Sequence, residues 1–141
     1  MMEERAELKG SHLTLDCAGC SGEMLQDEKR LNRFLEELVS VLGMRKLIDP
    51  VIVKCDHKLN SWDQGGLSAF IMIAESHISI HTFPADQLVT ADVYSCKPFD
   101  IEQTISMFEV AFETHEIKTH LIKREIEGLR RSRLRSLSVN S

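Results

Sequence analysis

Three strand-like runs follow one another between residues 67 and 95, and they constrain the fold more than any other feature. The runs are LSAFIMIA (67–74), HISIHTF (77–83) and LVTADVYS (88–95). Only turn-sized gaps separate them, and gaps of that size join antiparallel strands, because parallel strands need a much longer connection. The sequence therefore predicts an antiparallel meander.

Two further segments show the helical spacing of apolar residues. The first begins at Ser21 and ends at Gly43, a residue suited to terminate a helix. The second opens with Asp100, and Gln103 three residues later completes a capping-box pattern. The apolar stripes consist of Leu31, Phe34, Leu35, Leu38 and Leu42 in the first helix, and of Ile101, Ile105, Phe108 and Phe112 in the second.

Three more runs have the pattern of strands, at residues 12–17, 50–55 and 117–126. The expected order is therefore β-α-β-β-β-α-β. Two helices with one apolar stripe each can cover only one face of such a sheet. We expect an α+β fold, namely a two-layer α/β sandwich with a mainly antiparallel sheet and two helices on one face. The uncovered face favours dimerisation or a functional site.

Length and charge limit the class of protein. The 141 residues are enough for one domain with one core, which we expect to span residues 1–128. Residues 129–141 contain four Arg and no acidic residue, and we expect a basic, disordered tail there. The rest of the chain carries a formal net charge of −9. This acidic body argues against a nucleic-acid-binding surface, which needs clustered Lys and Arg.

No apolar stretch is long enough to span a membrane, and the charged N-terminus MMEERAELKG differs from a signal peptide. We expect a cytoplasmic protein whose four cysteines are reduced thiols.

Cys17 and Cys20 form a C-x-x-C motif, which is typical of a redox pair or of half a zinc site. Cys55 with His57 lacks the usual spacing of a second half. We favour small buried cysteines and expect no metal site.

The stretch AESHISIHTFP (74–84) concentrates acid, base and nucleophile side chains in one short strand. Each of these polar groups needs a hydrogen-bond partner or must stay near solvent. Ser68 follows a glycine pair and Cys96 ends another strand, so a Ser, a His and a Cys could form a nucleophile set with thiol chemistry. The residues alone leave this open, because Ser, His and Cys occur in most chains of this size.

The same stretch resembles the hallmark of a known family. ESHISIHTFP (75–84) matches, throughout its length, the Glu-Ser-His segment and the His-Thr-aromatic-Pro segment of the bacterial S-adenosylmethionine decarboxylase proenzymes. The resemblance continues in GSHLTLDCAGC (10–20), GLS (66–68) and ADVYSC (91–96), and it covers about residues 10–126. Members of this family cleave themselves to make a covalent pyruvoyl cofactor.

The resemblance implies a cut between Glu75 and Ser76. Ser76 attacks its own preceding carbonyl with help from Ser68, and the resulting ester is eliminated after His81 removes the Cα proton. A dehydroalanine is left, and its hydrolysis gives the pyruvoyl group. Because strand alternation puts residues 76 and 81 on opposite faces, we also expect a kink between them.

In the mature enzyme the resemblance implies that the pyruvoyl group forms a Schiff base with S-adenosylmethionine and accepts electrons as carbon dioxide leaves. Cys96 then protonates the product carbon, and Trp62 stacks on the adenine ring. The product supplies aminopropyl groups for spermidine, and the expected assembly is a homodimer of cleaved protomers.

Two positions depart from the family pattern. The family has Glu directly after the aromatic-Pro pair, where this chain has Ala85 followed by Asp86, and Lys97 stands where Gly normally follows the Cys. Asp86 or Asp63 could supply the missing contact to the ribose hydroxyls. A pyruvoyl-dependent arginine or ornithine decarboxylase is therefore an alternative. An inactive regulatory paralogue is a third possibility, against which the intact Ser76, His81 and Cys96 argue.

Overall fold

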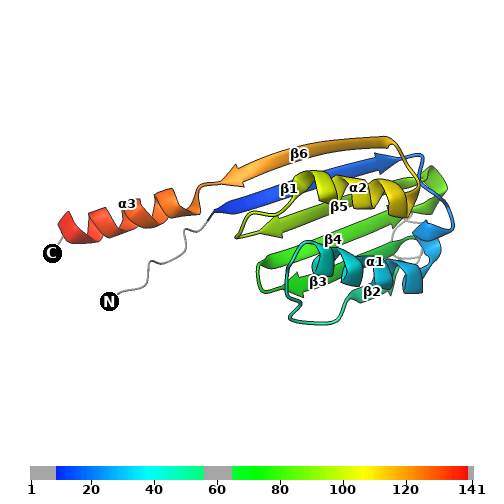
Figure 1. Ribbon diagram of the computed structural model, residues 1–141, viewed down its shortest axis with the longest axis horizontal. Helices are drawn as coiled ribbons and strands as arrows, with labels where there is room; N and C mark the ends of the chain where they lie inside the picture. The colour runs from blue at the N-terminus through cyan, green and yellow to red at the C-terminus, as the bar shows by residue number, and fades with distance from the viewer. Residues whose placement is uncertain (1–8, 56–64, 140–141) are drawn as a thin grey trace.

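The computed structural model describes residues 9–55 and 65–139 of the chain (Figure 1). Six strands form one sheet in the order β2-β3-β4-β5-β1-β6, and each neighbouring pair is antiparallel. The strands are β1 (Gly10–Ala18), β2 (Val51–Lys54), β3 (Leu67–Ile73), β4 (Ser76–Phe83), β5 (Leu88–Ser95) and β6 (Glu116–Arg124). The helical elements are η1 (Met24–Gln26), α1 (Glu28–Val41), η2 (Pro84–Asp86), α2 (Ile101–Phe112) and α3 (Ile126–Val139). The predicted meander and α+β sandwich are confirmed.

Helices α1 and α2 cover one face of the sheet (Figure 1). The ring of Phe34 on α1 lies edge-on to Phe108 and Phe112 of α2, with ring centroids 5.0 and 5.5 Å away. Alternate residues of the strands, such as Leu13, Ile78 and Val93, complete this core. None of the helices in residues 9–55 and 65–139 is long and apolar enough to cross a membrane.

The other face of the sheet, here called the open face, is a grid set by the strand register. One row across it consists of Met72, His77, Tyr94, His12 and Ile122; the next of Val51, Phe70, Ser79, Asp92, Thr14 and His120; and the third of Val53, Ser68, His81, Thr90, Asp16 and Lys118. The centre of the face is therefore polar, and large exposed apolar side chains flank it on β2, β3 and β6.

The first long helix begins later than predicted. Asp27 adopts an extended backbone conformation and its side chain accepts a hydrogen bond from the N–H of Arg30, so α1 starts at Glu28 rather than at Ser21. Its predicted end is confirmed, because Gly43 follows the last turn at φ +68°. The cap of α2 is also confirmed, since the Asp100 side chain accepts from the N–H of Gln103 at 2.9 Å.

The C-terminal segment differs from the expected disordered tail, because α3 spans Ile126–Val139 and extends away from the sheet past the end of β6 (Figure 1). Leu and Arg favour helices, and Glu127 pairs with Arg130 and Arg131 at helical spacing. The helix starts before residue 128, so the domain boundary proposed there stays a prediction.

Candidate active site

The turn between β3 and β4 holds a strained residue. Only Ala74 and Glu75 separate the paired Ile73 and Ser76. Hairpin turns of this length usually place positive φ angles within the loop, whereas here the positive angle falls on Ser76, at φ +151°. A non-glycine residue in such a conformation costs on the order of 1–3 kcal/mol. The strain lies at the serine that the sequence predicts to be the self-cleavage nucleophile.

The peptide bond before Ser76 is polarised by Cys96. The backbone N–H of Cys96 donates a hydrogen bond of 2.8 Å to the carbonyl oxygen of Glu75. The Ser76 Oγ lies 3.4 Å from the Cys96 Sγ, within hydrogen-bonding distance for sulfur. A donor on this carbonyl oxygen stabilises the negative charge that develops when a nucleophile attacks the carbon. Nucleophile, carbonyl and thiol are therefore together in one chain.

The side chain of Glu75 is held in a buried position, with 7% of it exposed. Its Oε1 accepts from the backbone N–H of Arg45 at 3.0 Å, and its Oε2 lies 3.7 Å from the Lys97 Nζ. Burial raises the pKa of the Glu75 carboxyl, but the Arg45 hydrogen bond and the Lys97 charge together lower it more, so the net direction is downward. Lys97 also donates to the Gly43 carbonyl at 3.1 Å, which ties the turn to the end of α1.

Ser68 and His81 form a second pair on the open face. They are register partners on β3 and β4, and the Ser68 Oγ lies 3.0 Å from the His81 Nδ1. The expected kink between residues 76 and 81 is wrong, because β4 pairs with β5 without a break from Ser76 to Phe83. Five residues at about 3.3 Å each separate Ser76 from His81 by about 17 Å. Within one chain, the two pairs therefore do not meet.

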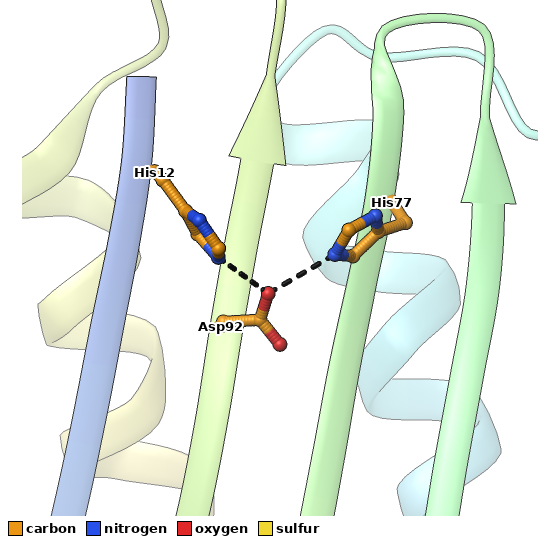
Figure 2. A group of neighbouring side chains, drawn as sticks. All are labelled: His12, His77 and Asp92. Atoms are coloured by element: carbon orange, nitrogen blue, oxygen red, sulfur yellow. Dashed lines mark hydrogen bonds and ion pairs between the residues drawn. The ribbon is translucent and has the colours of Figure 1, made fainter. Parts of the chain in front are cut away.

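Figure 2 shows a third polar group, which was not expected from the sequence. The strand register places it on the open face, between the row of Ser68 and His81 and the strand end at Ser76. The Asp92 Oδ2 is 2.6 Å from the His12 Nε2 and 3.0 Å from the His77 Nε2, and Ser79 donates to the Asp92 Oδ1. The residues come from β1, β4 and β5. The sequence contains a signal for this group, namely polar residues at alternate positions of the strands that hold it. The signal can be recognised only when the order of the strands is known, and the sequence did not define that order.

Comparison with known proteins identifies the family. A family model described as S-adenosylmethionine decarboxylase matches residues 11–125. The chain belongs to this family. An S-adenosylmethionine decarboxylase proenzyme of Clostridium botulinum (strain Langeland) is 30% identical over 112 residues, covering 77% of this chain and 90% of that protein. An arginine decarboxylase proenzyme of Pyrobaculum arsenaticum is 32% identical over 106 residues, covering 67% and 72%.

The fold is shared with a solved structure. The crystal structure of the adenosylmethionine decarboxylase from Aquifex aeolicus superposes with a TM-score of 0.70 at 23% identity, covering 86% of this chain and 94% of that one. Membership of the S-adenosylmethionine decarboxylase family makes this chain a self-cleaving decarboxylase that depends on a pyruvoyl group.

The residues predicted to bind substrate in this decarboxylase are only partly described. Asp86 ends η2, directly after β4, and its side chain is exposed at the end of the strand that carries His81. Gln87 follows in a left-handed conformation at φ +53° and leads the chain into β5. Trp62 and Asp63 lie outside the described residues, as does His57.

Cys17 and Cys20 belong to the core of the decarboxylase. Both are buried free thiols, each 1% exposed. The hydrogen bond with Cys20 and then burial raise the pKa of the Cys17 thiol, which therefore stays protonated at neutral pH. The favoured interpretation of small buried cysteines is confirmed by their position. Neither belongs to a group of three metal-ligating side chains in the described ranges.

Proposed function

We propose that this chain decarboxylates S-adenosylmethionine after cutting itself between Glu75 and Ser76, and so supplies the aminopropyl donor for spermidine. The main support is the local geometry of this peptide bond. Ser76 is strained, its hydroxyl lies beside the Cys96 thiol, and the Glu75 carbonyl accepts a hydrogen bond from the Cys96 N–H. These features favour attack by the hydroxyl on the adjacent carbonyl.

The cleavage follows from these groups. The Ser76 Oγ bonds to the Glu75 carbonyl carbon, the C–N bond breaks, and the hydroxyl proton ends on the freed amine. A base removes the Cα proton of residue 76, and the Cβ–O bond breaks to release Glu75 as a carboxylate. Water then displaces ammonia and leaves a keto group at the new N-terminus. We assign the base to His81 and assistance in the first step to Ser68.

The residues around Ser76 fit a pyruvoyl group. Such a group supplies an electron sink for the pair that remains when carbon dioxide leaves the substrate. The Cys96 thiol lies 3.4 Å from the Ser76 Oγ, and we assign it the protonation of the product carbon.

We further propose that the working assembly is a homodimer with shared sites. The His81 and Ser68 pair is about 17 Å along the strand from Ser76, too far for proton transfer within one chain. A second copy packed on the open face in the opposite direction would bring its His81 toward the strand end that carries the first Ser76. Exposed Phe70, Met72 and Ile122 on this face favour such packing.

A complementation experiment tests the shared site. A Ser76→Ala chain keeps His81 but cannot be cut, and a His81→Ala chain keeps Ser76 but lacks the base. We expect the His81→Ala chain to mature only when it is co-expressed with Ser76→Ala, as read by intact mass. A Ser76→Ala, His81→Ala double variant is the matched control partner and should not restore maturation. No restoration by either partner would contradict shared sites and leave the cleavage chemistry unaffected.

The assignment of S-adenosylmethionine as the substrate depends on Trp62 and on an acidic residue that can replace the Glu missing at position 85. A site that lacks a charged acceptor for a substrate hydroxyl loses about 1–3 kcal/mol of binding free energy, which weakens the affinity about tenfold to hundredfold. Asp86 or Asp63 must supply that contact if the nucleoside is bound. If the acid instead binds a guanidinium or ammonium group, arginine or ornithine becomes the substrate. The arginine decarboxylase relative supports this alternative.

Release of labelled carbon dioxide from S-adenosylmethionine, arginine and ornithine, measured in parallel, decides the substrate. We expect release from S-adenosylmethionine, and a marked rise in KM for Asp86→Ala if that acid binds the ribose. Release from an amino acid alone would contradict the assignment and leave the pyruvoyl chemistry in place.

A further inference from the structure

The group of His12, His77 and Asp92 lies on the open face apart from both catalytic pairs (Figure 2). One donor atom from each residue lies within 4.8 Å of the other two. The two imidazoles approach the same carboxylate oxygen from opposite sides, one from β1 and one from β4, while Asp92 sits on β5 between them. The proposed self-cleavage and decarboxylation use none of these side chains.

The geometry is close to that of a metal centre. Zinc binds His nitrogen at about 2.0–2.1 Å and carboxylate oxygen at about 2.0–2.2 Å, so tetrahedral ligands lie roughly 3.3 Å apart. The present Nε2 to Oδ2 distances are 2.6 and 3.0 Å. Side-chain rotations that open these two distances by less than about 1 Å would bring them to the spacing of zinc ligands.

The surroundings hold the three side chains in place. Ser79 donates to the other carboxylate oxygen of Asp92, which orients the carboxylate. The ring of Tyr94 lies between the imidazoles, 5.3 Å from His12 and 5.7 Å from His77, and Phe70 lies 5.6 Å from His77 on its other side. Hydrogen bonds to a ligating carboxylate and packed rings are the supporting contacts that metal sites require.

The ligand set selects the class of ion. Two imidazoles with one carboxylate suit zinc and similar transition metals, whereas magnesium and calcium prefer oxygen ligands. In a single chain the side chains are between 21% and 32% exposed, so an ion can reach them before a second copy packs on the open face.

We propose that His12, His77 and Asp92 form a binding site for a zinc-class divalent cation, with a fourth position open to water. The sequence predicted no metal site, because only the order of the strands brings these three ligands together. It is independent of the proposed function, because binding is measured without decarboxylation.

The test uses the full-length chain after removal of any histidine tag. Zinc is titrated in competition with a chromophoric chelator, and Co2+ substitution reports the ligand geometry through its visible absorption. We expect one ion per wild-type chain and loss of this binding in His12→Ala, His77→Ala and Asp92→Asn. Ser79→Ala keeps all three ligands and should weaken the affinity by about 10- to 100-fold.

His120→Ala is the matched control, since His120 lies on the same face one row from His12 but outside the group. It should bind zinc as the wild type does. Melting curves without metal verify that each variant is folded. The proposal is overturned if zinc binds the wild type no more tightly than the folded His12→Ala or Ser79→Ala variants, or if the loss occurs in His120→Ala instead.

Discussion

The two ends of β4 carry the proposed catalytic side chains in opposite physical states. At the first residue, Ser76 has a strained backbone, a buried neighbour in Glu75, and a fixed contact with Cys96. Toward the other end, His81 lies in regular extended structure, is exposed, and contacts only the Ser68 hydroxyl among these groups.

The difference separates two requirements of self-cleavage. The Ser76 end contains an electrophile, a nucleophile and a polarising donor, so the acyl shift can begin there with groups of the same chain. The His81 end contains a base and a hydroxyl but no bond to break. One copy of β4 thus supplies the bond that reacts at one end and the base at the other. Assembly with a second copy would bring the base of one chain to the reacting bond of the other.

The largest effect is expected from Ser76→Ala. This change removes the hydroxyl that is proposed to accept the acyl group, so the chain should stay uncut and resist hydroxylamine. Intact mass before and after hydroxylamine treatment measures both. Ser106→Ala, an exposed serine on α2, is the control and should mature fully. Cleavage after Glu75 in the Ser76→Ala chain would show that the strained end does not provide the nucleophile.

A nearly equal effect is expected at the other end from His81→Ala. The acyl shift can still occur, but the Cα proton stays in place, so the chain should accumulate as an ester. Hydroxylamine attacks esters and spares amides, and it should therefore cut this variant at residue 75. His115→Ala, whose side chain is 96% exposed, is the control. Normal maturation of His81→Ala would assign the elimination base elsewhere.

Much of the fold could be predicted because local patterns define it. The alternation of 88–95 gave the bounds of β5, and the cap at Asp100 marked the start of α2. The start of α1 was missed because an extended residue, Asp27, interrupts the helical stretch. The position of β1 between β5 and β6 depends on long-range pairing that no local pattern encodes.

The site residues could be predicted from the sequence only where they belong to a family motif. The family resemblance predicted Ser76, His81, Cys96 and Ser68 as site residues, but it did not predict that they lie in two separate pairs. The roles of Lys97 and of the Cys96 N–H were missed, because each depends on which loop the β3–β4 turn contacts. The His12 and His77 contacts with Asp92 likewise depend on strand order.

A smaller loss is expected from Cys96→Ala, which acts on turnover more than on cleavage. The backbone N–H of residue 96 remains, so the Glu75 carbonyl stays polarised and the chain should still be cut. Loss of the proton donor should reduce kcat by about 10²- to 10⁴-fold or give a misprotonated product. Cys96→Ser should retain more activity than Cys96→Ala. Full and clean turnover by Cys96→Ala would place the proton donor elsewhere.

A change of a few-fold is expected from Lys97→Gly, which restores the residue normal for the family. The pair with Glu75 is half exposed on the lysine side, and such pairs contribute up to about 1 kcal/mol. Less restraint on the turn should slow self-cleavage by up to about fivefold, as followed by the time course of proenzyme conversion. Lys97→Arg keeps the charge and should convert at nearly the wild-type rate. Equal conversion rates for Lys97→Gly and the wild type would show that the Lys97 contact with Glu75 does not speed self-cleavage.

The smallest effect concerns the pH dependence of stability at the strained end. The folded-state pKa of Glu75 is lowered, because the Arg45 hydrogen bond and the Lys97 charge outweigh burial. Its ionised form therefore stabilises the fold at pH values above the unfolded pKa of about 4.3, and this contribution is lost as the pH falls through the folded value. In the uncut Ser76→Ala background, Glu75→Gln should lower the free energy of unfolding at neutral pH by about 1 kcal/mol or less. Urea unfolding at several pH values should show this difference shrinking on acidification. A difference that stays constant or grows in acid would mean that the Glu75 carboxylate is not stabilised by the contacts that hold the turn.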